Sequence, residues 1–159
     1  MASAALAISA LASIVSAAAL IRPDKAAEHT VIVPAPPPTY SAAESATAKE
    51  QACTAWLSAS EAMAKTGNAV ANAPLGWDEP ETKEAIGMEA RTALVQKAYL
   101  MSQVGPATPH ETREGIREFV LAHGDYEEAT MRRMGSEADA AIDRMNAAVK
   151  TVNTTCGLG

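Results

Sequence analysis

Catalytic residues occur in recognisable combinations, and this sequence of 159 residues contains few of them. It has no G-x-S-x-G nucleophile motif, no H-E-x-x-H zinc motif and no glycine-rich phosphate loop. A di-iron helical bundle needs a glutamate three residues before a histidine, and neither His110 nor His123 has one at that spacing. We therefore expect a protein that is not an enzyme, with no catalytic residue, no bound cofactor and no metal site.

His123 is the side chain whose surroundings come closest to a chemical site. It lies on the apolar face of a predicted helix, next to Tyr126 and among the acids Asp125, Glu127 and Glu128. A histidine in such surroundings can change its charge near neutral pH and act as a switch. We favour the alternative of a boundary residue, whose ring packs in the core and whose nitrogens meet water or a carboxylate.

Two cysteines, Cys53 and Cys156, lie near opposite ends of the region that follows residue 40. An even number of cysteines behind an export-like segment predicts a disulfide, because oxidising compartments preserve such bonds. Neither cysteine has a second cysteine or a histidine at zinc-ligand spacing, so the alternative is a pair of buried free thiols. The disulfide would close a loop of about 100 residues and stabilise the fold by about 4 to 5 kcal/mol in the chain-entropy model.

Residues 2–21 form a charge-free apolar run that ends at Arg22. At about 1.5 Å per residue, the run matches a membrane hydrocarbon core of about 30 Å. We therefore expect residues 1–21 to be a transmembrane anchor, with a signal peptide cleaved near Ala19 or a buried helix as alternatives. Arg22 and Lys25 would favour a cytoplasmic domain, but the predicted disulfide favours a domain on the extracytoplasmic side of the cell membrane, which we adopt.

The rest of the chain divides into a linker and one domain. Residues 22–40 predict an extended tether, because the clustered prolines at 34–38 favour polyproline II structure. Residues 41–159 suffice for one domain, and a composition rich in alanine with only 4% aromatic residues is typical of closely packed helices. The net charge of -6 disfavours a nucleic-acid partner, because no basic surface would release counterions from phosphates.

Capping signals and apolar spacing place the helices of this domain. The first begins at the capping box formed by Ser41 and Glu44. The second has Asp78 or Glu79 as its cap and ends at residues 105–106. A third begins directly afterwards, with Thr108 as its cap.

Gly124 decides whether the bundle has three helices or four. The apolar spacing continues across Gly124, which one long helix would satisfy, whereas Gly124 before Asp125-x-x-Glu128 indicates a stop and a new capping box. Four antiparallel helices bring the end of the chain next to the first helix, where Cys156 could reach Cys53. We therefore predict an all-α fold: an N-terminal transmembrane helix, a proline-rich linker and an antiparallel bundle of four helices whose third helix is short.

The layout resembles the small alanine- and proline-rich envelope proteins of actinobacteria. Three features carry this resemblance: the Ala/Ser-rich run at the amino terminus, the stalk at residues 34–38, and a helical domain with two cysteines that closes with Cys156-Gly157-Leu158-Gly159. The resemblance implies a location in the cell envelope and no defined activity.

The expected function is that of a non-enzymatic, membrane-tethered extracytoplasmic domain that binds or scaffolds another envelope protein. Trp77, in a loop beside glycine and proline, and the adaptable side chains of Met131 and Met134 are the candidate partner contacts. The favoured alternatives are that Trp77 covers the end of the bundle and that the methionines fill gaps in the core. The alternative is a carrier or sensor that holds a small apolar ligand between its helices, because alanine-lined, methionine-rich bundles can open such cavities.

Thiol labelling of intact cells tests the disulfide and the membrane side together. We expect a membrane-impermeant maleimide to label Cys53 and Cys156 only after reductant is added, because both are oxidised and lie outside the cell. Free thiols that only a membrane-permeant reagent reaches would contradict the disulfide and the outside location at once.

Overall fold

A computed structural model of the chain describes residues 38–158 and confirms four α-helices in that part of the chain. They are α2 (Ala42–Ala71), α3 (Pro80–Gln103), α4 (His110–Met131) and α5 (Gly135–Cys156). The predicted anchor at residues 1–21, and all but the last three residues of the predicted linker, lie outside the described residues. Among the helices of residues 38–158, none has the length and hydrophobicity to cross a membrane.

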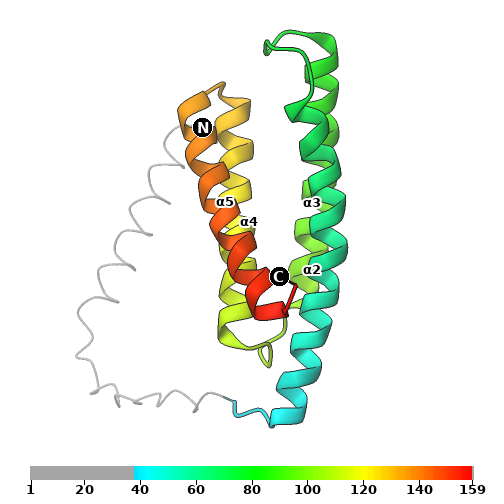
Figure 1. Cartoon of the computed structure of the whole chain (residues 1–159), viewed down its shortest axis with the longest axis vertical. Coiled ribbons are helices and arrows are strands. Elements are labelled where there is room, and N and C mark those ends of the chain that lie inside the picture. Colours follow the sequence, from blue (N-terminus) through cyan, green and yellow to red (C-terminus); the bar gives the residue numbers. More distant parts are fainter. Residues whose placement is uncertain (1–37, 159) are drawn as a thin grey trace, which may run out of the picture. The chain divides into compact units, whose positions relative to one another are not determined.

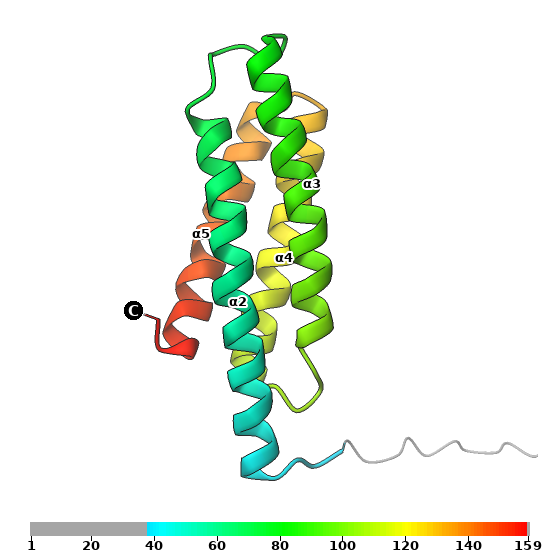
Figure 2. The ribbon, with the colours of Figure 1, turned by 90° about the vertical axis from the view of Figure 1, so that its right-hand side faces the viewer.

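The helices form two antiparallel hairpins, α2–α3 and α4–α5 (Figure 1). Figure 2 views the same ribbon from the side and shows α2–α3 in front of α4–α5. The two helices within a hairpin contact each other along their length, whereas contacts between the hairpins are sparse. Residues 39–159 form a compact unit with its own core, so we expect them to fold without the preceding residues.

Helix α2 begins at the capping box that the sequence predicts. The backbone N–H of Ser41 donates to Glu44 Oε2 at 2.7 Å, and the backbone N–H of Glu44 donates to Ser41 Oγ at 3.2 Å. The buried face of α2 follows at helical spacing and consists mostly of small side chains: Ala52, Ala55, Trp56, Ala59 and Met63. Alanines on this face allow neighbouring helices to approach closely around one large indole.

The predicted boundary at Gly124 is wrong. Helix α4 continues through Gly124 and ends at Met131. A glycine inside a helix costs only about 1 kcal/mol relative to alanine, and the long contact between α4 and α5 outweighs that cost. Asp125 caps no helix, because its carboxylate accepts a hydrogen bond from Arg144 of α5 at 2.8 Å.

The chain turns instead at residues 132–134. Arg133 adopts the left-handed conformation, with φ of 57°. Its N–H donates to the carbonyl of Thr130 at 3.0 Å, and the N–H of Met134 donates to the carbonyl of Ala129 at 2.9 Å. These bonds satisfy carbonyls that the end of α4 leaves free, as in other helix ends with a left-handed residue.

The other two predicted caps also differ in detail. Neither Glu79 before α3 nor Pro109 before α4 makes a side-chain capping bond. The predicted cap Thr108 is buried in the α3–α4 turn, where its hydroxyl accepts from the N–H of Gly105 at 3.1 Å. Asp78 pairs with Lys83 and Arg133.

Helices α4 and α5 approach each other closely at Gly115. A Cβ added to Gly115 would lie 2.9 Å from Cγ2 of Val152, which is fully buried. A Cβ added to Gly124, in the same helix, would meet nothing within 4 Å.

These two glycines make a matched pair of substitutions. We expect Gly124→Ala to raise the free energy of unfolding by about 0.5 to 1 kcal/mol, because alanine favours the helix and meets no neighbour. We expect Gly115→Ala to lower it by about 1 kcal/mol, because overpacking against Val152 outweighs the same gain. Chemical denaturation followed by circular dichroism measures both, and equal stabilisation by the two would contradict the close approach.

Candidate functional site

Trp56 of α2 joins the two hairpins near one end of the bundle. Its side chain is 1% exposed, and its Nε1–H donates to Oδ1 of Asn153 of α5 at 2.8 Å. Its ring meets Phe119 of α4 edge to face, with the ring centroids 4.9 Å apart. A single side chain of the first hairpin therefore contacts both helices of the second.

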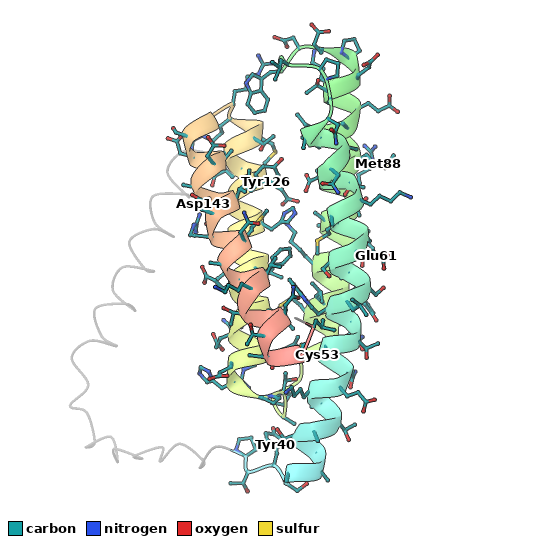
Figure 3. All side chains as sticks on the ribbon, in the orientation of Figure 1. Tyr40, Cys53, Glu61, Met88, Tyr126 and Asp143 are labelled. Atoms are coloured by element: carbon teal, nitrogen blue, oxygen red, sulfur yellow. A yellow bond between two sulfur atoms is a disulfide. The ribbon has the colours of Figure 1, made fainter. Side chains whose placement is uncertain are left out.

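The predicted disulfide lies beside this indole and is confirmed. Cys53 of α2 and Cys156, the last residue of α5, are bonded with their Cα atoms 5.5 Å apart. Cys53, labelled in Figure 3, lies where the end of α5 reaches α2. The bond leaves no free cysteine and fixes the hairpins to each other covalently at this end.

A buried polar cluster connects α3 to α4 further along the bundle. His123 of α4 is 3% exposed, and its Nε2 lies 3.0 Å from Oε1 of Glu89 of α3, which is 4% exposed. The other ring nitrogen, Nδ1, is buried without a hydrogen-bond partner and lies 3.7 Å from Glu127. The carboxylate of Glu127 accepts a hydrogen bond from Nζ of Lys97. His123 therefore agrees with the interpretation favoured from the sequence, in which its ring packs in the core and a ring nitrogen meets a carboxylate.

Tyr126 extends this cluster along α4. Its ring and the ring of His123 meet edge to face, with their centroids 5.8 Å apart. Burial raises the pKa of the Tyr126 hydroxyl, and the negative charge of Glu89 raises it further. The hydroxyl therefore stays protonated at neutral pH and can donate a hydrogen bond.

A cleft of about 750 Å³ opens above these side chains, between α2 and α5. Its walls are largely apolar and come from both hairpins: Leu57, Met63, Val70, Ile142, Met145 and Val149. Glu89, His123 and Tyr126 lie at its floor; Tyr126 and the wall residue Glu61 are labelled on opposite hairpins in Figure 3. The cleft is therefore an apolar space with one buried carboxylate at its base.

A smaller hollow of about 370 Å³ adjoins the cleft beneath the α2–α3 turn. It shares Val70 and Ile142 with the cleft and is bounded on the turn side by Trp77. The hydroxyl of Thr82 donates to the carbonyl of Pro74 at 2.6 Å and holds this turn against α3. Trp77 is 38% exposed, so its ring both covers the hollow and meets solvent.

The three predicted partner contacts come to the same end of the bundle. Trp77 lies in the α2–α3 turn, while Met131 ends α4 and Met134 precedes α5. Met131 is 77% exposed, and Met134 is half-buried. The guanidinium of Arg133 donates to both oxygens of Asp78 at 2.8 and 3.2 Å, which links the two turns.

Arg132 and Arg133, in the turn between α4 and α5, both pair with exposed acidic side chains. Hydrogen bonding to Arg133, and then to Lys83, lowers the pKa of the Asp78 carboxyl. Arg132 pairs with Glu128 of the preceding helical turn at 3.1 Å, with both side chains exposed. Neither guanidinium faces the cleft, so the cleft carries no arginine.

Glu89 is the residue of the site that the sequence reasoning missed. Of the three acids considered there, Asp125 and Glu128 are exposed and Glu127 lies 3.7 Å from His123, whereas the nearer partner Glu89 comes from another helix. A usable signal exists: Glu89 shares the buried face of α3 with Ala93 and Leu100 at four- and eleven-residue spacing. A carboxylate on such a face must find a partner or a ligand.

The arrangement has the features of a site that binds a small molecule reversibly. Within residues 38–158, no group of three or more His, Cys, Asp or Glu side chains is arranged to hold a metal ion. Apolar walls bury the body of a small molecule, and a few convergent polar groups at the base orient it.

Comparison with known proteins places the chain in a family. Its sequence matches the profile described as the Rv2240c four-helix bundle domain over residues 36–157. Searches of curated proteins and of solved structures gave no match. The match covers all four helices and supports the actinobacterial resemblance at the level of the family. The chain therefore belongs to the Rv2240c four-helix bundle domain family.

Proposed function

We propose that this domain binds a small apolar ligand in the cleft between its two hairpins. The observation that carries the proposal is the cleft itself, about 750 Å³ in volume with walls of aliphatic and methionine side chains. Ligand sites in proteins have volumes of roughly 300 to 1,000 Å³ and combine apolar walls with few polar groups. The cleft matches this description in size and in chemistry.

The connections between the hairpins support a cleft that persists and can also open. The Trp56 cluster and the disulfide hold one end, and the Asp78–Arg133 pair links the exposed turns at the other. An exposed ion pair is weak and is screened by salt. The turn end can therefore separate to admit a ligand while the disulfide end stays closed.

The proposal includes a location. The domain works on the extracytoplasmic side of the cell membrane, attached through residues 1–21 and the proline-rich linker. The Cys53–Cys156 bond supports this location, because disulfides persist in oxidising compartments.

Dye binding to the isolated domain, residues 39–159, tests the ligand site. We expect the fluorescence of N-phenyl-1-naphthylamine to rise on binding to the cleft. Ala64, an exposed alanine of α2, lines the cleft. We expect Ala64→Trp to fill part of this space and weaken dye binding by about tenfold or more.

Ala98 of α3 provides the matched control, because it is also an exposed helical alanine and lies away from the cleft. Ala98→Trp should leave dye affinity unchanged. Circular dichroism establishes that both variants are folded. Absence of dye binding to the wild-type domain, or equal loss in the two variants, would rule out a ligand site in the cleft.

A second function, the docking of an envelope protein, is supported by exposed apolar side chains of α3: Met88, Leu94, Val95, Tyr99 and Met101. By helical spacing Met88, Val95 and Tyr99 share one face, and Leu94 and Met101 share another. Exposed apolar patches are typical of interaction sites. Trp77, Met131 and Met134 remain candidate contacts at the end of the bundle.

Photo-crosslinking in intact cells tests the docking function. Benzoylphenylalanine placed at Leu94 or Met131 should give one defined adduct, whereas placement at the exposed Glu111 of α4 should give none. Adducts that are identical at all three positions would show only random collision and would count against docking.

A further inference from the structure

We infer that the ligand is a cationic amphiphile, an apolar body carrying a protonated amine, and that Glu89 is its counter-ion at the floor of the cleft. This inference rests on the proposed ligand-binding function and adds the charge of the ligand. Four observations lead to it: the charges that line the cleft, the partners of Glu89, the net charge of the buried cluster and the aromatic rings beside it.

The charged side chains that line the cleft are acidic. Glu61 and Glu89 line it together with His123, and no lysine or arginine of the described residues does so. An anionic head group would therefore lie beside carboxylates in a space with little water, where like charges repel strongly. Fatty acids and phosphate esters are thus disfavoured as ligands.

Glu89 has acceptor capacity beyond its ion pair with His123. Within residues 38–158, His123 is its one ion-pair partner, through Nε2 at 3.0 Å from Oε1. A carboxylate has about four acceptor sites on its two oxygens. An ammonium group in the cleft would donate to the oxygen that His123 does not meet, in a charge-assisted hydrogen bond.

The cluster around Glu89 has no net positive charge at neutral pH. It contains two glutamates, Glu89 and Glu127, together with Lys97 and His123. It therefore has one net negative charge while the imidazole is neutral, and no net charge when the imidazole is protonated. A cation is attracted in the first state and an anion in neither, so the cluster selects for a positive head group.

Two aromatic rings line the cleft next to His123, the partner of Glu89. Phe119 and Tyr126 line the cleft on either side of His123 along α4, with centroids 5.8 Å from the imidazole in both cases. The faces of such rings attract ammonium groups. The raised pKa of Tyr126, due first to burial and then to Glu89, agrees with a negative potential at the floor.

Three amphiphiles that share one chain test the charge of the ligand. Dodecylamine, 1-dodecanol and dodecanoate, each below its critical micelle concentration at neutral pH, are titrated against the dye bound to residues 39–159. We expect dodecylamine to displace the dye at a concentration about tenfold or more below that of 1-dodecanol. Dodecanoate should be the weakest of the three.

Glu89→Gln removes the charge while keeping the shape of the side chain and an oxygen that can accept from His123. We expect this variant to lose the advantage of dodecylamine over 1-dodecanol. Glu84→Gln is the matched control, because Glu84 lies on the same helix, is exposed and does not line the cleft. It should leave the order of the three amphiphiles unchanged.

The outcomes separate the two proposals. Equal displacement by dodecylamine and 1-dodecanol, or stronger displacement by dodecanoate, would overturn the inference and leave the apolar site standing. A dye that does not bind the wild-type domain would overturn both. If Glu89→Gln does not fold, the comparison of the three amphiphiles on the wild type still decides.

Discussion

The indole of Trp56 lies between the two hairpins of this bundle, bonded to Asn153 of α5 and packed edge to face on Phe119 of α4. The disulfide from Cys53 to Cys156 lies beside it. The α3–α4 turn joins the hairpins through the chain at this end, and these contacts add a connection from α2 to α4 and α5. Because the aromatic content is only 4%, this one large side chain has few substitutes, and small alanines surround it.

The cleft between the hairpins is a consequence of their being fixed at one end. Alanine-rich helices pack tightly around Trp56, but two rigid hairpins that are fixed at one end need not close along their whole length. The space between α2 and α5 becomes a cleft of about 750 Å³ with Met63 and Met145 in its walls. The floor of that cleft holds Glu89 and His123, which form the next connection between the hairpins. A buried carboxylate is costly without partners, and His123 is the partner that the protein supplies to Glu89 at the base of this apolar space.

The sequence predicts those parts of the fold that depend on local signals or on covalent chemistry. Ser41 and Glu44 form their capping box, and the two cysteines require a chain end close to α2, which favours four helices. The prediction of a helix boundary is wrong at Gly124. Glycine followed by Asp125-x-x-Glu128 is typical of a helix end and a new cap, but packing against α5 keeps α4 helical. A cavity between the helices was an alternative from the sequence, but its place and size were not predictable, because they depend on the distance between the hairpins, and periodicity reports only which face of each helix is buried.

Methionine methyl groups offer the most direct test of a ligand site between the hairpins, because this protein carries them both inside and outside the cleft. With methyl-labelled methionine and bound dodecylamine, NMR should show nuclear Overhauser contacts from the ligand chain to Met63 of α2 and Met145 of α5, which both line the cleft. It should show none to Met88 and Met101, which are exposed on α3. Contacts to Met88 or Met101 without contacts to the cleft methionines would contradict the account.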